Sequence, residues 1–491
     1  MKRKEEKGKL EVLKTRRCLA MLSAFSFLLA AVGAEPTKVY LLFDTEDYTC
    51  DRSNDAIRDV ANILTSEGVR GNFNIVGYLA TRLMELKRFD VIEALRPHVI
   101  GTQTLYHSRH PDLSELGEDP DYGRSYRRTL ADEAKGIGML EAVLGEGRCC
   151  FAAPPGNSIS PASFDVYSDL GIFLNLGTGT YGHKAEDGGY PRTMLTRSDG
   201  KVLGLWYFNQ VQIPYYVSFT IQNDLLPGRY GNIDATLNKL AEWDGAVLYM
   251  HPDMAVKTMH WDQPNYKKAN LVEWRKWRQV PDRNPTDTAI YYENLRDFIR
   301  RLKTDGRFEV SDLEVYLRSL KPRKVITMSD LPSIHAALRK NFGCLHGEAS
   351  WCVADVFQAV VRYLRGEAPQ MPGKAYGFLQ KPRGTETSVE VLASDLRTAA
   401  EKIDLSRFLP SEISVGGTKI GPADFLFAAL EVLTTGAEKV KVEPREQLGS
   451  FALIDCFEKF TLADTWMHTP EFKDRYVTDR LRLQLWTMRI E

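Results

Sequence analysis

The chain has 491 residues, of which 43% are hydrophobic and 26% charged, and its 64 Lys and Arg nearly balance its 65 Asp and Glu. This composition is ordinary for a globular protein, and the length predicts two or three domains at roughly 100–200 residues each. No basic stripe stands out along the sequence, so the charge pattern argues against nucleic acid as a partner.

The first 34 residues have the pattern of a secretory signal peptide. Residues 1–17 are basic, residues 18–32 are apolar, and the small residues up to Ala34 predict a cut between Ala34 and Glu35. The apolar part is shorter than the roughly 17–25 residues of a membrane-spanning helix, and no other run is long enough, so we expect no stable membrane span. A retained anchor is the alternative. Without the leader, which holds 8 Lys/Arg and 3 Asp/Glu, the net charge is −6. We therefore expect a secreted, periplasmic or cell-surface protein.

Strand patterns alternate with helix patterns from Lys38 to about Leu320, which predicts an α/β fold with parallel strands wrapped by helices. The predicted strands are Val39–Phe43, Gly71–Ile75, Val99–Gly101, Gly171–Leu176, Val202–Tyr207 and Ala246–Tyr249. The predicted helices among them include Ala56–Glu67, Thr129–Leu144 and Asp287–Arg301. Such folds gather their functional groups at the carboxyl ends of the strands.

The first predicted strand ends in three acids within four residues, Asp44, Glu46 and Asp47. Three carboxylates at one strand end repel one another unless they share a cation or a proton. This end of the sheet is therefore a candidate metal and general-base site. The alternative is a strand that runs into an acidic turn.

Residues 323–491 show mainly helical patterns, with two weak repeats at about 350–366 and 419–436. Asp355 and Asp424 occupy equivalent positions 69 residues apart, where each is expected near a helix N-terminus. The phrase Leu409–Gly417 resembles the short repeats of pseudomurein-binding modules, which implies binding to an envelope polymer. We therefore expect an accessory domain there. Its only plausible local disulfide joins Cys344 and Cys352, and the chain has no CxxC pair for a zinc-thiolate site.

Four segments in the first part of the chain follow one another in a recognisable order. They are Phe43–Asp47 (FDTED), Ile100–Leu113 (IGTQTLYHSRHPDL), Phe151–Gly156 (FAAPPG) and Val247–Pro252 (VLYMHP). Together they resemble the NodB-type polysaccharide deacetylases, also called carbohydrate esterase family 4. The resemblance covers about residues 38–320. It implies a distorted (β/α) barrel over 35–322 and hydrolysis of acetyl groups on an amino-sugar polysaccharide or peptidoglycan-like polymer, with the help of one divalent metal, expected to be zinc.

The resemblance also implies roles for individual residues. Asp44 matches the family's general base and His251 its catalytic acid, which protonates the leaving group. Glu46 matches the carboxylate metal ligand, with Asp47 as the alternative. Pro155 and Gly156 of the third segment are expected to contact the substrate.

The second segment departs from the family's His-Ser/Thr-x-x-His pattern of two metal ligands. One register places Gln103 and His107 at the two positions, and the other places Tyr106 and His110 there. We prefer the first register, in which His110 or Gln103 supports Glu46 and His107 at the metal. Glutamine is a neutral oxygen donor and binds zinc poorly beside imidazole.

The third segment carries Ala152 where the family has an arginine that orients the base. Loss of that positive charge predicts a raised pKa for Asp44.

Three hypotheses remain open. The chain is a secreted metal-dependent deacetylase, a degenerate deacetylase barrel that binds glycan without turnover, or an amidase for a small cyclic amide. The last suits a cytosolic enzyme better than an exported one. Whether the site binds a metal discriminates between the first two.

Overall fold

The computed structural model describes residues 35–490 except 159, 177–204, 207–215, 266–272, 321–323, 344–350, 450–471 and 473–474. The expected signal peptide and Cys344 lie outside the described residues. Within the described ranges, no helix combines the length and the apolar character that crossing a membrane requires.

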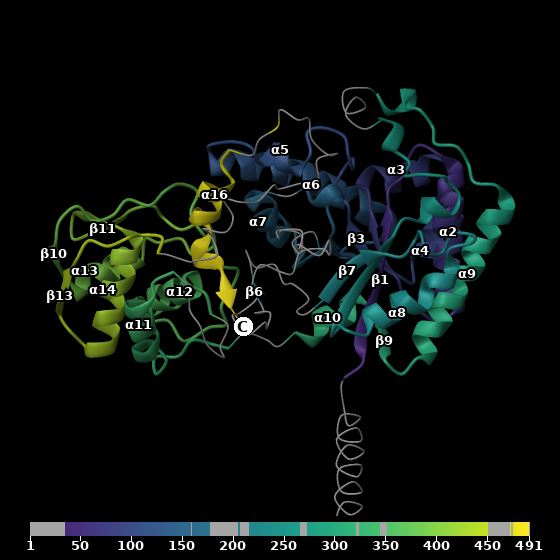
Figure 1. Cartoon of the computed structure of the whole chain (residues 1–491). Helices are drawn as coiled ribbons and strands as arrows, with labels where there is room; N and C mark the ends of the chain where they lie inside the picture. The colour runs from purple at the N-terminus through teal and green to yellow at the C-terminus, as the bar shows by residue number, and fades with distance from the viewer. Residues whose placement is uncertain are drawn as a thin grey trace, which may run out of the picture.

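The N-terminal part is built on one sheet of eight strands (Figure 1), in which seven follow the order β5-β4-β3-β2-β1-β8-β7 and β9 pairs with the first half of β1. The strands are β1 (Thr37–Thr45), β2 (Asn72–Ile75), β3 (Val99–Thr102), β4 (Cys149–Ala152), β5 (Leu174–Asn175), β7 (Tyr216–Thr220), β8 (Gly245–Met250) and β9 (Phe308–Ser311). Every pairing in this sheet is parallel. With helices packed around it, the sheet forms the distorted (β/α) barrel expected from the sequence.

One predicted barrel strand lies elsewhere. The described part of Val202–Tyr207 is β6 (Leu205–Trp206), which pairs antiparallel with β14 (Arg489–Ile490) at the end of the chain and not with the barrel. The sequence pattern cannot show this, because a short apolar run carries no information about its pairing partner. The barrel instead includes β4, β7 and β9, which were not among the predicted strands.

The helices between the strands include the three predicted ones, each of which begins earlier in the chain than expected. They are α2 (Asp51–Ser66), α3 (Gly77–Glu85), α4 (Phe89–Leu95), α5 (Leu113–Gly117), α6 (Tyr122–Leu144), α7 (Pro161–Asp169), α8 (Ile233–Leu240), α9 (Pro285–Thr304) and α10 (Leu313–Ser319). Side-chain caps extend two of them: Asp121 accepts a hydrogen bond from the Arg124 amide at α6, and Asn284 accepts one from the Asp287 amide at α9.

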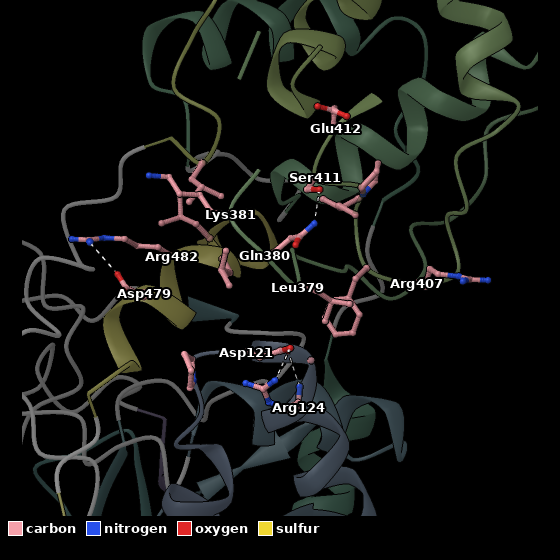
Figure 2. A pocket seen from close by; sticks show the side chains of 18 of the residues that line it. Asp121, Arg124, Leu379, Gln380, Lys381, Arg407, Ser411, Glu412, Asp479 and Arg482 are labelled. Atoms are coloured by element: carbon pink, nitrogen blue, oxygen red, sulfur yellow. Dashed lines mark hydrogen bonds and ion pairs between the residues drawn. The ribbon is translucent and has the colours of Figure 1, made fainter. Parts of the chain in front are cut away.

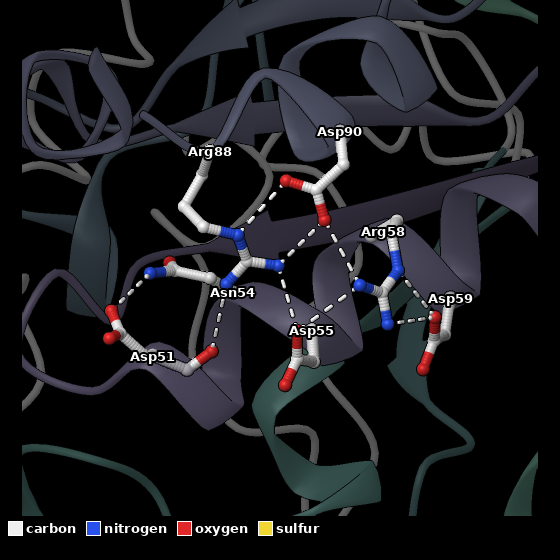
Figure 3. Close-up of polar contacts among 7 residues, drawn as sticks. All are labelled: Asp51, Asn54, Asp55, Arg58, Asp59, Arg88 and Asp90. Atoms are coloured by element: carbon white, nitrogen blue, oxygen red, sulfur yellow. Dashed lines mark hydrogen bonds and ion pairs between the residues drawn. The ribbon is translucent and has the colours of Figure 1, made fainter. Parts of the chain in front are cut away.

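Helix α2 follows the acidic end of β1 and is held to α4 by a polar network (Figure 3). The Arg88 guanidinium donates to Asp55 of α2 at 2.7 Å and to Asp90 of α4 at 2.9 Å. The Arg58 guanidinium donates from α2 to the same Asp90 carboxylate at 3.0 Å. Charge-assisted bonds shared between two arginines fix the position of α2 against the outside of the barrel.

Residues from 326 onward form a second hydrophobic cluster, separate from those of the barrel. Its helices are α11 (Leu331–Lys340), α12 (Val353–Leu364), α13 (Ala393–Ala400), α14 (Pro422–Thr435) and α16 (Val477–Leu483). Two small antiparallel pairs accompany them, β10 (Val389–Leu392) with β13 (Lys439–Val442) and β11 (Ile413–Val415) with β12 (Thr418–Ile420). The expected mainly helical character is confirmed, and Asp355 and Asp424 lie in the first turns of α12 and α14. The boundary at residue 322 and the duplication remain predictions.

Candidate functional site

Strand β1 delivers the candidate base to the inside of the barrel. Side chains alternate between the two faces of a strand. Val39, Leu41 and Phe43 pack in the cluster that includes the surrounding helices, whereas Tyr40 and Leu42 belong to a smaller cluster with residues of β3, β4 and β8. The same alternation places Asp44 on the face of Tyr40 and Leu42, at the carboxyl end of the strand.

Glu46, just beyond β1, is the centre of a buried hydrogen-bonded network. Its Oε1 accepts a hydrogen bond from Gln103 Nε2 at 2.8 Å and lies 3.1 Å from His107 Nε2. Its Oε2 accepts a hydrogen bond from Trp261 Nε1 at 2.8 Å. Burial opposes ionisation of Glu46, but the neighbouring charges of His107 and His251 outweigh it and hold the pKa of Glu46 well below its usual range.

A tight turn after β3 brings Gln103 and His107 to the same oxygen. Thr104 and His107 both have a positive φ, at 67° and 60°, which is uncommon for residues with a side chain. The turn is held by the Gly77 amide, which donates to the Thr104 carbonyl at 3.0 Å. The two side chains therefore meet through a turn and not through the i, i+4 face of a helix. This arrangement corresponds to the first of the two registers.

His107 also contacts a carboxylate on its other side. Its Nδ1 lies 3.2 Å from Asp262 Oδ2, and Ser108 donates to the same oxygen at 2.7 Å. Burial lowers the pKa of His107, but Glu46 and Asp262 together outweigh this and raise it to about 10. A carboxylate on the far nitrogen fixes the ring so that Nε2 points at Glu46.

His251 follows β8, and its side chain lies between the carboxylates of Asp44 and Glu46. Its Nε2 is 3.5 Å from Asp44 Oδ2 and 3.4 Å from Glu46 Oε1. Its Nδ1 lies 2.9 Å from Gln222 Oε1, and because an amide oxygen only accepts, this nitrogen carries a proton. Burial lowers the pKa of His251, but the Glu46 and Asp44 carboxylates raise it to about 9. The ring of His260 lies 4.5 Å from that of His251, edge to face.

The pKa of Asp44 is raised to about 6, mainly because the side chain is buried. His251 and the side chain of Asn74, at the end of β2, act in the opposite direction. The direction of the pKa shift agrees with the expectation from Ala152, but the cause is burial. The loop that follows Ala152 lies beside this group, because Asn74 Nδ2 donates to the Ala153 carbonyl at 3.3 Å.

Pro155 and Gly156 form a short turn at the end of the same loop, in which Gly156 has a φ of 53°. This conformation favours glycine. Their expected contact with substrate remains a prediction.

Two predicted ligands are not brought to this centre. Asp47 accepts hydrogen bonds from the Thr49 hydroxyl and the Ser53 hydroxyl, both at 2.6 Å, and so anchors the turn into α2. His110 Nδ1 lies 2.5 Å from Glu115 Oε1, in a separate group with Asp112. His110 therefore does not stand in for the missing histidine, because its ring is turned toward the start of α5.

The side chains at the centre suit a divalent metal. Ligand atoms of Asp44, Glu46 and His251 all lie within 4.8 Å of one another, and His107 Nε2 lies 3.1 Å from Glu46 Oε1. Gln103 Oε1 is buried and has no hydrogen-bond partner among the described residues. This neutral oxygen beside Glu46 is therefore available as a metal ligand. Carboxylate, imidazole and amide oxygen are all known ligand types for first-row divalent metals.

Several contributors to this centre were not predicted from the sequence. Asn74, Gln222 and His260 have no motif of their own; only the position of Asn74 at a strand end is a signal that could have revealed it. Trp261 is buried, and its Nε1 donates a hydrogen bond to Glu46. Asp262 is the next residue and comes ten residues after the Val247–Pro252 segment, without a motif of its own.

No family model matches the chain, and no curated protein matches it. Several solved structures are similar to part of the chain. A CE4 family pseudoenzyme from Bacillus anthracis is 15% identical, with 58% of this chain and 66% of that chain covered and a TM-score of 0.32. A family 4 acetyl xylan esterase from Clostridium thermocellum, solved with a cobalt ion, is 15% identical, with 58% and 93% covered and a TM-score of 0.31. A 4-alpha-glucanotransferase from Thermococcus litoralis is 12% identical, with 59% and 41% covered and a TM-score of 0.37.

The similar structures thus include family 4 carbohydrate esterases. Their similarity to this chain is too low to bear on its activity, and they include a protein with a different activity.

Proposed function

We propose that the protein is an exported, metal-dependent hydrolase that removes acetyl groups from an amino-sugar polysaccharide or another cell-envelope glycan. The observation that carries this proposal is the convergence of Asp44, Glu46 and His251 at the carboxyl ends of β1 and β8. A buried carboxyl with a raised pKa beside an imidazole is the pairing that acid–base catalysis needs.

In this proposal Glu46 and His107 would hold a divalent metal, with Gln103 beside them, and such a metal would supply polarisation of the acetyl carbonyl and a lowered pKa of the attacking water. Ionised Asp44 removes the proton from that water. His251 gives a proton from Nε2 to the departing sugar nitrogen or oxygen, so that acetate and the free sugar group result. Gln222 keeps Nε2 of His251 directed at the reacting atoms by accepting the Nδ1 proton.

The test measures acetate release from an N-acetylglucosamine polymer and an O-acetylated xylan, with added zinc and after removal of metal by a chelator. We expect release by the wild type that depends on metal, and a loss of at least about 100-fold in kcat for Asp44→Asn, because the general base is gone. An Asp234→Asn change in exposed α8 is the matched control and should leave the rate unchanged. Undiminished acetate release by Asp44→Asn would exclude this mechanism.

A second candidate function is glycan binding without turnover, and Gln103 favours it. Its amide donates to Glu46 where the resemblance implies a metal-binding imidazole. This function predicts that the wild type retains no metal and releases no acetate, yet still binds the polymer in a pull-down with insoluble glycan.

A further inference from the structure

A cavity of about 1630 Å³ lies between the N-terminal end of α6 and the helical region. Figure 2 shows Arg124 of α6 on one side and Gln380 and Lys381 on the opposite side. The volume exceeds the roughly 300–1,000 Å³ of a small-molecule pocket, so its size fits part of a polymer.

The walls of this cavity carry five basic side chains, four acidic ones and apolar surface. The basic residues are Arg124, Arg127, Lys381, Arg407 and Arg482, and the acidic ones are Asp121, Glu412, Glu446 and Asp479. Arg124, Arg407 and Arg482 form ion pairs with Asp119, Asp404 and Asp479. Arg127 and Lys381 are exposed and have no ion-pair partner among the described residues. Their two charges are left for a ligand.

Helix α6 carries a further cation, Lys135, eight residues after Arg127. Lys135 lies about 12 Å along the axis from Arg127, at 1.5 Å per residue. Like Arg127, Lys135 is exposed and has no ion pair in the described part of the chain.

The ammonium group of Lys135 contacts the ring of Tyr106, the residue before His107. Lys135 Nζ lies 5.8 Å from the centre of that ring, and the Arg109 guanidinium lies 4.4 Å from it. Arg109 also lacks an ion pair within the described ranges. The four unpaired cations Lys381, Arg127, Lys135 and Arg109, which we call the cationic track, thus lead from the cavity to the edge of the catalytic centre.

We propose that the cationic track binds an acidic polysaccharide, so that the polymer presented to the catalytic centre carries carboxylated sugars. This inference rests on the proposed function, because it names the class of substrate for that site. Four unpaired cations favour a chain with repeated negative charges. The carboxylates of the cavity and the amide of Gln380 suit sugar hydroxyl groups. Leu379, 39% exposed, and the half-buried Phe408 offer apolar surface for the faces of sugar rings. The track was not visible as a basic stripe because its residues are scattered from position 109 to 381.

The test measures binding of polygalacturonate and of neutral galactan of the same length to the full chain by isothermal titration calorimetry. We expect polygalacturonate to bind at least 10-fold more tightly, with affinity that falls as salt rises. The double variants Arg127→Gln/Lys381→Gln and Arg109→Gln/Lys135→Gln should each weaken that binding at least 5-fold. Lys340→Gln/Lys402→Gln removes the same charge from exposed positions outside the track and should have no effect.

Equal affinity for the two polymers, or the same loss in the Lys340→Gln/Lys402→Gln control, would overturn the proposal. So would equally tight binding of a single-stranded oligonucleotide of matched charge, since the track would then be a general polyanion surface. Binding is measured without turnover, so an inactive catalytic centre leaves these outcomes unchanged. Conversely, acetate release by a protein that does not prefer polygalacturonate would support the proposed function and reject only the track.

Discussion

At the scale of single residues, Glu46 organises the centre through the groups around its two oxygens. An indole, an amide and two imidazoles surround one buried carboxylate. Such a carboxylate stays ionised because its neighbours donate to it or carry positive charge. The identity of residue 103 then decides whether this cluster of donors is also a strong metal site.

Gln103→His should therefore raise the affinity for zinc by about 10-fold or more, since it adds an imidazole beside Glu46 and His107. Titration against a competing chelator measures this affinity, and circular dichroism shows whether the variant is folded. Gln370→His, at an exposed position in the helical region, is the matched control. A zinc affinity equal to that of the wild type would show that position 103 does not face the metal.

At the scale of elements, the packing of α3 on α6 supports the turn that carries His107. A Cβ added at Gly77 would lie 2.6 Å from the backbone of Gly136, and one added at Gly136 would lie 3.0 Å from the backbone of Leu105. The two helices approach this closely only because both positions are glycine. The Gly77 amide also holds the Thr104 carbonyl, so the same contact orients the site.

Gly77→Ala should lower the stability of the barrel by about 1–3 kcal/mol, because the new methyl group overlaps backbone atoms that cannot move away cheaply. Gly138→Ala, on the exposed side of α6 with no atom within 4 Å of the added Cβ, should instead leave stability unchanged or raise it by about 0.5–1 kcal/mol. Thermal unfolding followed by near-ultraviolet circular dichroism compares the two. The prediction is wrong if Gly77→Ala melts at the wild-type temperature.

At the scale of the whole molecule, the helical region contacts the barrel through α7 and the start of α6. Lys374 donates to the Asp165 carbonyl at 3.0 Å and also binds the Asp169 carboxylate. The ring of Phe408 packs edge to face on those of Tyr122 and Tyr126. The contact borders the cavity, so it also sets the position of Lys381 relative to α6.

Asp165 makes this contact sensitive to pH. Burial raises its pKa to about 7, although Lys374 and the Tyr122 hydroxyl act in the opposite direction. A carboxyl with a raised pKa binds its proton more tightly in the folded state, so its contribution to stability is present below pH 4 and is lost as the pH rises through about 7.

We therefore expect the melting temperature to fall between pH 5 and pH 7, with a loss of at most about 1.4 kcal/mol per pH unit from this group. Asp165→Asn should remove that part of the pH dependence, because the amide cannot ionise. Calorimetry at several pH values measures how the melting temperature of the wild type and the variant depends on pH. An unchanged slope in the variant would contradict the assignment.

The sequence alone indicated the alternation of strands and helices in the barrel and the acids at the end of its first strand, because apolar periodicity and strand-end polarity are local properties. It therefore predicted a site at Asp44 and Glu46, whereas the expected roles of His251, Gln103 and His107 came from the family resemblance. It could not determine which side chains meet. The partners Trp261, Asp262, Gln222 and Asn74 come from segments far apart in the chain, and His110 is turned away by a local ion pair with Glu115.

Tertiary structure also decided the pairing of β6 with β14, the cavity between the barrel and the helical region, and the contact of Arg109 and Lys135 with the ring of Tyr106. Each of these depends on contacts between residues distant in sequence. No pattern of period 2 or 3.6 within one segment encodes such contacts.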